Sequence, residues 1–198
     1  FPESFLELDR LKATAFFEAL SDLGLSVKSI ARIISGVKTF YRFLVEEEKI
    51  SKNPLARISN PKLPKHLPSV LTHDEVMRMM DCIDLSKISG ERDKTILMLL
   101  YGSGLRVSEL VSLEVNNLFL EEGIIKVLGK GNKERLVPIG NKTIKQVELY
   151  LLYYRRHVAN EKSGAQLILN QQGKSLSRVS IFKTIKKLAE QAGIKKTI

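Results

Sequence analysis

Two cations, Arg106 and Lys130, occupy positions from which they can bind one anion. Arg106 follows a Gly-Ser-Gly sequence at 102–104 that ends a strongly apolar helix, and a new helical turn begins near Ser108. An arginine at such a junction can direct its planar guanidinium and nearby backbone N–H groups at a phosphate or a carboxylate. The spacing also allows a simpler interpretation, in which Arg106 only pairs with Glu109 one helical turn further on.

Lys130 lies between two glycines at the turn of a predicted β-hairpin. Apolar and β-branched residues at 123–128 and 134–139 predict the strands, and GKGN at 129–132 predicts the turn. A lysine in this position is exposed and mobile, so it can enter a nucleic-acid groove or give a proton to a leaving group. A solvated hairpin lysine without a function explains the same pattern.

The elements that must position these residues are mostly helices. Residues 93–102 are apolar on nearly every face, which predicts a helix buried on all sides. Further helices are predicted at 13–20, 27–48, 73–83, 141–158 and 175–192, and a short strand is predicted at 166–170. The predicted N-caps are Ser26, Thr72 with Glu75 as a capping box, and Asn141.

Basic residues are concentrated in the last third of the chain. The formal net charge is +10, and residues 123–198 alone hold sixteen Lys and Arg against four Asp and Glu. Such a field attracts a polyanion, and counterion release from nucleic acid is the usual source of the affinity. A membrane is disfavoured because no long basic amphipathic helix with bulky apolar residues is present. A basic surface that serves only solubility remains open.

Composition argues against several other classes of protein. The apolar run at 96–101 is too short to span a bilayer, and the N-terminal residues do not resemble a signal peptide, so a soluble cytoplasmic protein is expected. Cys82 is the only cysteine, and the three histidines, His66, His73 and His157, lack ligand spacing. No disulfide, metal site or cofactor is therefore expected.

Prolines 61, 64 and 68 mark a linker. Proline at every third or fourth position prevents helix formation and removes backbone donors, so an extended, semi-rigid segment is expected at 60–70. This segment divides the chain into a helical domain at 1–59 and a second domain at 71–198.

The sequences GLRVSELVSL at 104–113 and GKGNKERLVPIG at 129–140 closely resemble the tyrosine recombinase (phage integrase) family. Within that family they are similar to the bacterial Xer chromosome-dimer resolvases, nearer to the D type than to the C type. The segment at 60–68 resembles the interdomain linker of the family, and RDK at 92–94 resembles the start of its first buried catalytic-domain helix. The resemblance implies a mainly α fold with a small β-hairpin or sheet (α+β). A helical SAM-like core-binding domain and an integrase catalytic domain would close around duplex DNA as a clamp.

The resemblance also implies roles for three residues. Members of the family attack the scissile phosphate with a tyrosine oxygen and form a 3′-phosphotyrosyl link, with no metal or nucleotide cofactor. Arg106 matches the first arginine of the catalytic set, which holds a nonbridging phosphate oxygen. Lys130 matches the hairpin lysine that protonates the departing 5′ oxygen, and Glu109 matches an acidic position that orients the site.

The match stops short of the rest of the catalytic set. The family continues with a histidine-arginine box and the nucleophilic tyrosine, and none of the five tyrosines lies in the nucleophile's context. Tyr101 and Tyr154 are expected in the core, whereas Tyr41, Tyr150 and Tyr153 are expected at partly exposed helix positions. The catalytic domain is thus expected to be partial and the N-terminal domain to lack its first helices, so that the chain alone cannot cleave DNA.

Double-stranded DNA at the nucleoid is the expected partner, bound by four recombinase protomers that are identical or of two kinds. The candidate DNA contacts are Lys28, Arg32, Lys38, Arg42, Lys62, Lys65, Lys133, Arg135, Arg178, Lys183, Lys186 and Lys187. A solvated helix face explains the pattern at 27–48 about as well. A noncatalytic DNA-binding or architectural protein on the same scaffold and a mobile-element integrase of this family also remain open. A helical protein-interaction module is hard to reconcile with the charge of the last third.

Overall fold

The computed structural model describes residues 8–63, 69–129 and 131–196. These residues form two compact units, one on each side of 64–68, and each unit has its own hydrophobic core. Lys65, His66 and Lys130, which were singled out from the sequence, lie outside the described residues. Within the described ranges, no helix has both the length and the apolar character that a bilayer-spanning segment needs.

The first unit is built on two helices, α1 (Arg10–Asp22) and α2 (Val27–Glu46). The chain reverses between them at Gly24, whose φ of 79° is accessible to glycine without steric cost. The Ser26 hydroxyl accepts a hydrogen bond from the Ser29 N–H at 3.2 Å, which confirms the predicted cap. The apolar faces of both helices enclose a core formed by Ala13, Phe17, Ile30, Ile34, Tyr41, Leu44 and Leu55.

The segment that follows α2 packs back against it. The Asn53 side-chain amide donates to the Lys38 carbonyl oxygen at 3.1 Å, and Leu55 is fully buried. The Lys38 ammonium group donates in turn to the Ile58 carbonyl oxygen. Lys38 thus fastens this segment to α2 by both its backbone and its side chain.

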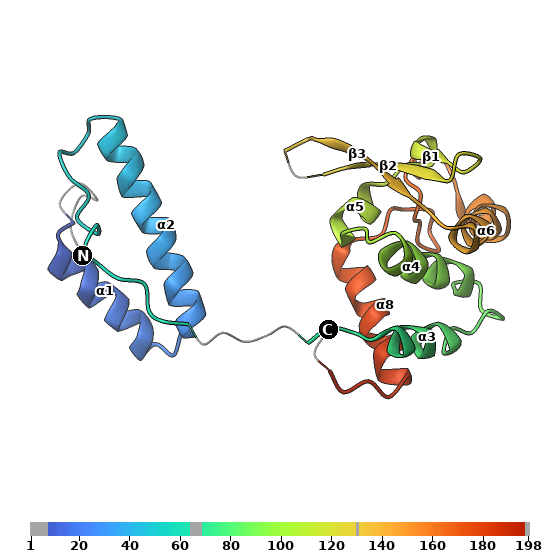
Figure 1. Cartoon of the computed structure of the whole chain (residues 1–198), viewed down its shortest axis with the longest axis horizontal. Helices are drawn as coiled ribbons and strands as arrows, with labels where there is room; N and C mark the ends of the chain where they lie inside the picture. The colour runs from blue at the N-terminus through green and yellow to red at the C-terminus, as the bar shows by residue number, and fades with distance from the viewer. Residues whose placement is uncertain (1–7, 64–68, 130, 197–198) are drawn as a thin grey trace. The chain divides into compact units, whose positions relative to one another are not determined.

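The helices of the second unit are α3 (His73–Asp81), α4 (Gly90–Gly102), α5 (Val107–Ser112), α6 (Asn141–Tyr150), the π-helical turn η3 (Leu151–Arg155), α7 (Arg156–Val158) and α8 (Arg178–Gln191). A small sheet lies at one edge of this unit, with α4 and α5 next to it and α3 farther away (Figure 1). The Thr72–Glu75 capping box at the start of α3 is present as predicted. Asn141 is not the cap of α6, because Gly140 occupies the N-cap position and the helix begins at Asn141 itself.

The sheet has three antiparallel strands in the order β1-β2-β3. The predicted hairpin is formed by β2 (Ile124–Leu128) and β3 (Glu134–Pro138), with Ile125 opposite Val137 and Val127 opposite Arg135. A third strand, β1 (Leu118–Phe119), follows the 3₁₀ turn η2 (Val115–Asn117) and was not predicted. With only two residues, β1 has no periodicity that a sequence pattern could reveal.

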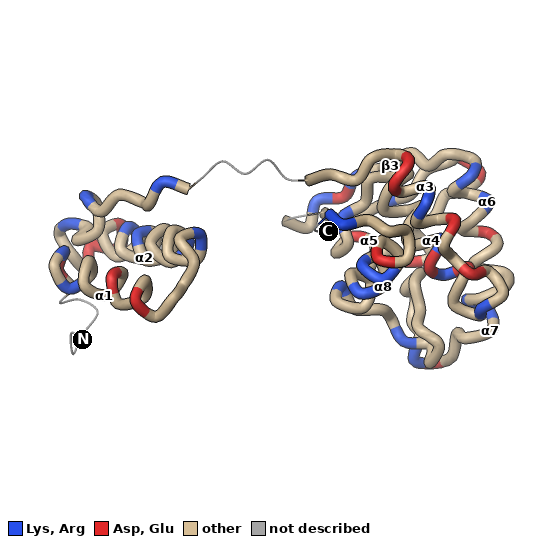
Figure 2. Tube along the Cα trace, turned by 90° about the horizontal axis from the view of Figure 1, so that it is seen from below, with Lys and Arg blue, Asp and Glu red and all other residues tan. Residues whose placement is uncertain are grey.

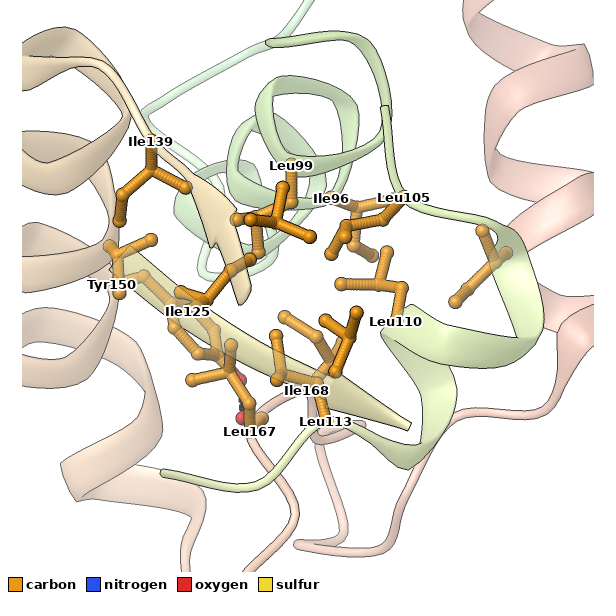
Figure 3. Close-up of a cluster of buried hydrophobic side chains, with 14 of the residues drawn as sticks. Ile96, Leu99, Leu105, Leu110, Leu113, Ile125, Ile139, Tyr150, Leu167 and Ile168 are labelled. Atoms are coloured by element: carbon orange, nitrogen blue, oxygen red, sulfur yellow. Dashed lines mark hydrogen bonds between the residues drawn. The ribbon is translucent and has the colours of Figure 1, made fainter. Parts of the chain in front are cut away.

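The strand predicted at 166–170 is wrong. The segment forms only two isolated bridges, Glu114 with Gln166 and Leu169 with Ser175, because its backbone pairs with different segments one residue at a time. Its apolar residues are nevertheless buried, and Leu167 and Ile168 lie beside Leu110, Leu113 and Ile125 in the core of the unit (Figure 3).

The exposure of the tyrosine side chains differs in part from what the sequence predicted. Tyr154 is buried and Tyr153 is exposed, as expected, but Tyr41 and Tyr150 are also buried. The Tyr150 hydroxyl donates to the Leu167 carbonyl oxygen at 2.9 Å and accepts from the Leu169 N–H at 3.0 Å, so its polar end is satisfied inside the core. Tyr101 was expected in the core but is 45% exposed, and its hydroxyl contacts His73 Nδ1 at 3.0 Å on the surface.

Candidate active site

Arg106 is fixed at the entrance to α5. The chain leaves α4 through Gly104, whose φ is 60°, and Leu105 then inserts into the core with 5% exposure. The Arg106 backbone N–H donates to Glu109 Oε2 at 2.8 Å, which fixes the backbone from which the Arg106 side chain projects. The junction predicted from the glycine pair is therefore a well-defined start of a helix.

The Arg106 guanidinium is only partly used within the protein. Its Nη1 donates to Glu109 Oε1 at 2.9 Å, yet 70% of the side chain is exposed. No other described residue forms a hydrogen bond with Nε or Nη2 of Arg106. The simple pairing with Glu109 and the capacity to bind an external anion, which appeared as alternatives in the sequence, thus coexist.

A second arginine reaches the same carboxylate from the sheet. Arg135 lies in β3, and its Nη1 and Nη2 donate to Oε1 and Oε2 of Glu109 at 2.5 and 2.9 Å. This two-pronged geometry is the strongest arrangement for an arginine and a carboxylate. Arg135, predicted as a DNA contact, is thus a partner of Glu109 in this structure.

Glu109 is the buried centre of this arrangement, with 3% of its side chain exposed. The hydrogen bond from Arg135 is the main cause that lowers the pKa of Glu109 from 4.5 to about 2, and the Arg106 backbone and side chain contribute. Burial opposes this shift because it penalises the charged form. Glu109 is consequently a stable anion near neutral pH, and the trio of Arg106, Glu109 and Arg135 carries one net positive charge.

The hairpin turn next to this trio is described on both sides of Lys130. The Gly129 N–H donates to the Lys133 carbonyl oxygen at 2.8 Å, and Gly131 and Asn132 have φ values of 75° and 59°. A Cβ at Gly129 would lie 3.5 Å from Arg135 Nη1 and 3.8 Å from Glu109 Oε1. The turn that carries Lys130 therefore begins directly beside the Glu109–Arg135 pair.

The other predicted DNA contacts lie on separate elements. All of the following side chains are exposed: Lys28, Arg32 and Arg42 on α2, Lys62 in the segment that follows the first unit's helices, Lys133 in the hairpin turn, and Arg178, Lys183, Lys186 and Lys187 on α8. Figure 2 shows the Lys and Arg residues along α2 and α8. Lys38 differs from these residues because it is half-buried and bonded to Ile58.

Comparison with known proteins identifies the class. Residues 69–198 match the Phage integrase family, and residues 2–48 match the Phage integrase, N-terminal SAM-like domain. The chain belongs to the phage integrase family. The resemblance predicted from the sequence and the α+β fold class are thereby confirmed.

Relatives and solved structures agree with this assignment. Tyrosine recombinase XerD of Staphylococcus aureus is 44% identical over 179 residues, which cover 90% of this chain and 61% of the relative. The chain thus spans less than two thirds of the length of the curated relatives it matches. XerA recombinase has a TM-score of 0.58 at 26% identity, with coverage of 99% of this chain and 66% of that one. XerH site-specific recombinase, bound to a palindromic difH substrate, has a TM-score of 0.79 at 21% identity, with coverage of 100% and 59%.

Proposed function

We propose that the protein to which this chain belongs is a site-specific recombinase that cuts and rejoins DNA strands through a 3′-phosphotyrosyl intermediate. The observation that carries the proposal is Arg106, whose guanidinium is oriented by a buried carboxylate but remains largely exposed. This is the geometry expected of a cation that must meet a phosphate without rearranging at the moment of reaction.

The reaction assigns one task to each residue. A tyrosine hydroxyl gives up its proton to a base, its oxygen attacks the scissile phosphorus, the P–O5′ bond breaks, and the electron pair of that bond stays on the 5′ oxygen. Arg106 binds a nonbridging oxygen and offsets the negative charge of the pentacoordinate transition state. Lys130 gives a proton to the departing 5′ oxygen, and Glu109 holds Arg106 in place. Attack of a 5′ hydroxyl on the phosphotyrosine reverses these steps and rejoins the strand.

The described tyrosines supply no candidate for the nucleophile. Tyr41, Tyr150 and Tyr154 are buried, and the Tyr101 hydroxyl is hydrogen-bonded to His73. Tyr153 is exposed but belongs to η3, away from the family context of the nucleophile. We therefore predict that these 198 residues alone form no covalent adduct with DNA.

Duplex DNA is the proposed substrate. The exposed cations of α2 and α8 would contact phosphates, and such contacts are released by salt. XerH is bound to a DNA substrate in its solved structure, and a solved lambda integrase tetramer is bound to a Holliday junction. These relatives support an assembly of four protomers, of one or two kinds, on two duplexes.

Resolution of chromosome dimers is the proposed role. Its support is the 44% identity to a tyrosine recombinase of the XerD type. An integrase of a mobile element would use the same residues on a different DNA site. The two roles can therefore be distinguished by testing cleavage on a chromosomal resolution site and on a mobile-element end.

Covalent trapping tests the proposal. The full-length product of the gene that encodes this chain is incubated with nicked duplex carrying a candidate resolution site, beside an Arg106→Ala variant, and run on a denaturing gel. A protein–DNA band that is lost in the variant is expected. Salt-sensitive binding without a band, on both resolution sites and mobile-element ends, would support a noncatalytic DNA-binding protein instead.

A further inference from the structure

Arg135 lies on the inward-facing side of a basic hairpin, although 39% of its side chain remains exposed. In β3, residues 135 and 137 share one face of the strand, and Val137 is buried with 8% exposure. Across the ladder Arg135 lies opposite Val127, which is also buried. The strand thus places Arg135 over the apolar side of the sheet, where its guanidinium meets Glu109.

The two arginines use the carboxylate in different ways. Arg135 donates through both terminal nitrogens, one to each oxygen, whereas Arg106 donates through one side-chain nitrogen only. Arg135 therefore neutralises Glu109, and the charge of Arg106 is left over for an external anion. If Arg135 were absent, Glu109 and Arg106 would form a pair with no net charge, and the carboxylate would compete with a phosphate for the same nitrogens.

We propose that Arg135 is a positioning residue for the reaction: it satisfies the Glu109 carboxylate and so keeps Arg106 available to the scissile phosphate. The inference rests on the proposed recombinase function. It differs from the earlier prediction that Arg135 contacts DNA directly, because Arg135 now acts through Glu109 and Arg106.

The same ion pair joins the hairpin to α5. Glu109 and Arg135 are 26 residues apart in the sequence, and their bidentate bond links the helix that begins at Arg106 with the strand that leaves the turn. Gly129 lies next to both groups: a Cβ there would be 3.5 Å from Arg135 Nη1 and 3.8 Å from Glu109 Oε1, which are ordinary contact distances. Arg135 thereby also fixes the base of the turn that carries Lys130 relative to the helix that carries Arg106.

A charge-rescue experiment separates a positioning role from a DNA contact. Cleavage of the nicked duplex is timed for full-length wild-type protein, Arg135→Met, Glu109→Gln and the double variant, with Arg135→Lys as a version that keeps the charge but not the two-pronged bond. Lys126→Met is the matched control, because it removes another hairpin cation that pairs with Glu134 at 3.3 Å and does not bond to Glu109. Thermal unfolding confirms that each variant is folded.

Arg135→Met is expected to slow cleavage about 100-fold, the loss typical when one transition-state donor, here Arg106, is no longer available to the phosphate. The double variant is expected to recover at least about tenfold of that loss, because the neutral amide that replaces the carboxylate no longer offsets the charge of Arg106. Arg135→Lys should fall between wild type and Arg135→Met, and Lys126→Met should cleave as wild type. Should Arg135→Met not fold, Arg135→Lys with and without Glu109→Gln gives the same comparison.

Two results would overturn the inference. A double variant as slow as Arg135→Met would mean that the effect of Arg135 does not act through the charge of Glu109, which contradicts the inference. Wild-type rates in Arg135→Met would mean that it has no role in positioning. If wild-type protein itself forms no adduct, the proposed function fails instead.

An NMR titration of the Glu109 carboxyl carbon in the 198-residue chain gives a readout that needs no activity. In the wild-type chain the pKa of Glu109 is about 2, and the hydrogen bond from Arg135 is the main cause of this low value. In Arg135→Met the pKa of Glu109 should rise toward 4.5. An unchanged titration would show that Arg135 does not govern the carboxylate, which also contradicts the inference.

Discussion

Two basic regions of this protein use the same residue types in opposite ways. On α2 of the first unit, Lys28, Arg32 and Arg42 are exposed, and no ion pair with another described residue holds them. In the second unit, Arg106 and Arg135 converge on one buried carboxylate. The difference lies in Glu109, which turns two flexible cations into groups of fixed position.

This contrast distinguishes residues that contribute to DNA affinity from residues that contribute to the cleavage reaction. Free surface cations create a field that attracts a polyanion and depends on salt, but they impose little geometry. A cation held by a buried partner has lost its conformational freedom before the substrate arrives, so less ordering is needed when the transition state forms. Substitutions on α2 should therefore weaken DNA binding, whereas substitutions around Glu109 should slow cleavage.

The largest expected difference is between matched arginine-to-lysine substitutions. Arg106→Lys keeps the charge but loses the planar fork that serves Glu109 and the phosphate together, so cleavage by the full-length protein should fall about 100-fold. Arg42→Lys keeps the charge on α2, where geometry matters little, and DNA affinity should change less than about twofold. Timed trapping and fluorescence anisotropy measure the two effects. If Arg106→Lys and Arg42→Lys reduced their respective activities by the same factor, the two regions would not differ in their need for a fixed geometry.

The second largest expected difference is in the free energy of unfolding after loss of a carboxylate. Glu109→Ala leaves two arginines side by side without their buried acceptor, and the free energy of unfolding should fall by about 1–3 kcal/mol. Glu46→Ala at the exposed end of α2 should change it by less than about 0.5 kcal/mol. Urea unfolding at neutral pH gives both values, and a loss for Glu46 as large as that for Glu109 would contradict the importance of burial.

The same carboxylate predicts a dependence on acid. Because the folded-state pKa of Glu109 is lowered to about 2 from 4.5, its stabilisation is fully present above pH 4.5 and is lost as the pH falls toward 2. The Glu109→Gln variant should therefore lose less stability than wild type between about pH 5 and 3. Glu75, whose pKa is lowered chiefly by Lys196, should maintain part of the slope in both proteins. Parallel curves of urea midpoint against pH would show that Glu109 is not ionised as described.

The smallest expected effect belongs to a single cation of α2. Arg32→Ala should reduce the slope of log binding constant against log salt by about 0.9, the value for one lost phosphate contact. Anisotropy titrations from about 50 to 200 mM salt measure this slope. An unchanged slope would place Arg32 on a solvated face that does not meet DNA, the alternative left open by its sequence pattern.

Much of the site could be predicted because local rules govern it. The glycines at the end of α4 predicted a helix junction at Arg106, and the hairpin followed from its apolar, β-branched strands and glycine turn. The partner of Glu109 was missed although a signal existed. Arg135 lies two residues before Val137, and alternation along a strand predicts that both face the same side, so a buried anion within reach of Arg135 could have been sought.

Other features could not be predicted because they depend on distant parts of the chain. Tyr150 can be buried in the core because Leu167 and Leu169 supply an acceptor and a donor for its hydroxyl. The segment at 166–170 has the composition of a strand, but its neighbours offer single bridges rather than a continuous edge. Both outcomes follow from tertiary packing, which overrides local propensity.

The central claim is that Arg106 offsets the charge of the scissile phosphate. The most direct test replaces that phosphate with a methylphosphonate, which lacks the negative charge, and compares cleavage by the full-length wild-type and Arg106→Ala proteins. Arg106→Ala should cleave the ordinary phosphate at least about 100-fold more slowly than wild type, and most of this defect should disappear on the neutral substrate. A defect of equal size on both substrates would show that Arg106 serves the site in some other way.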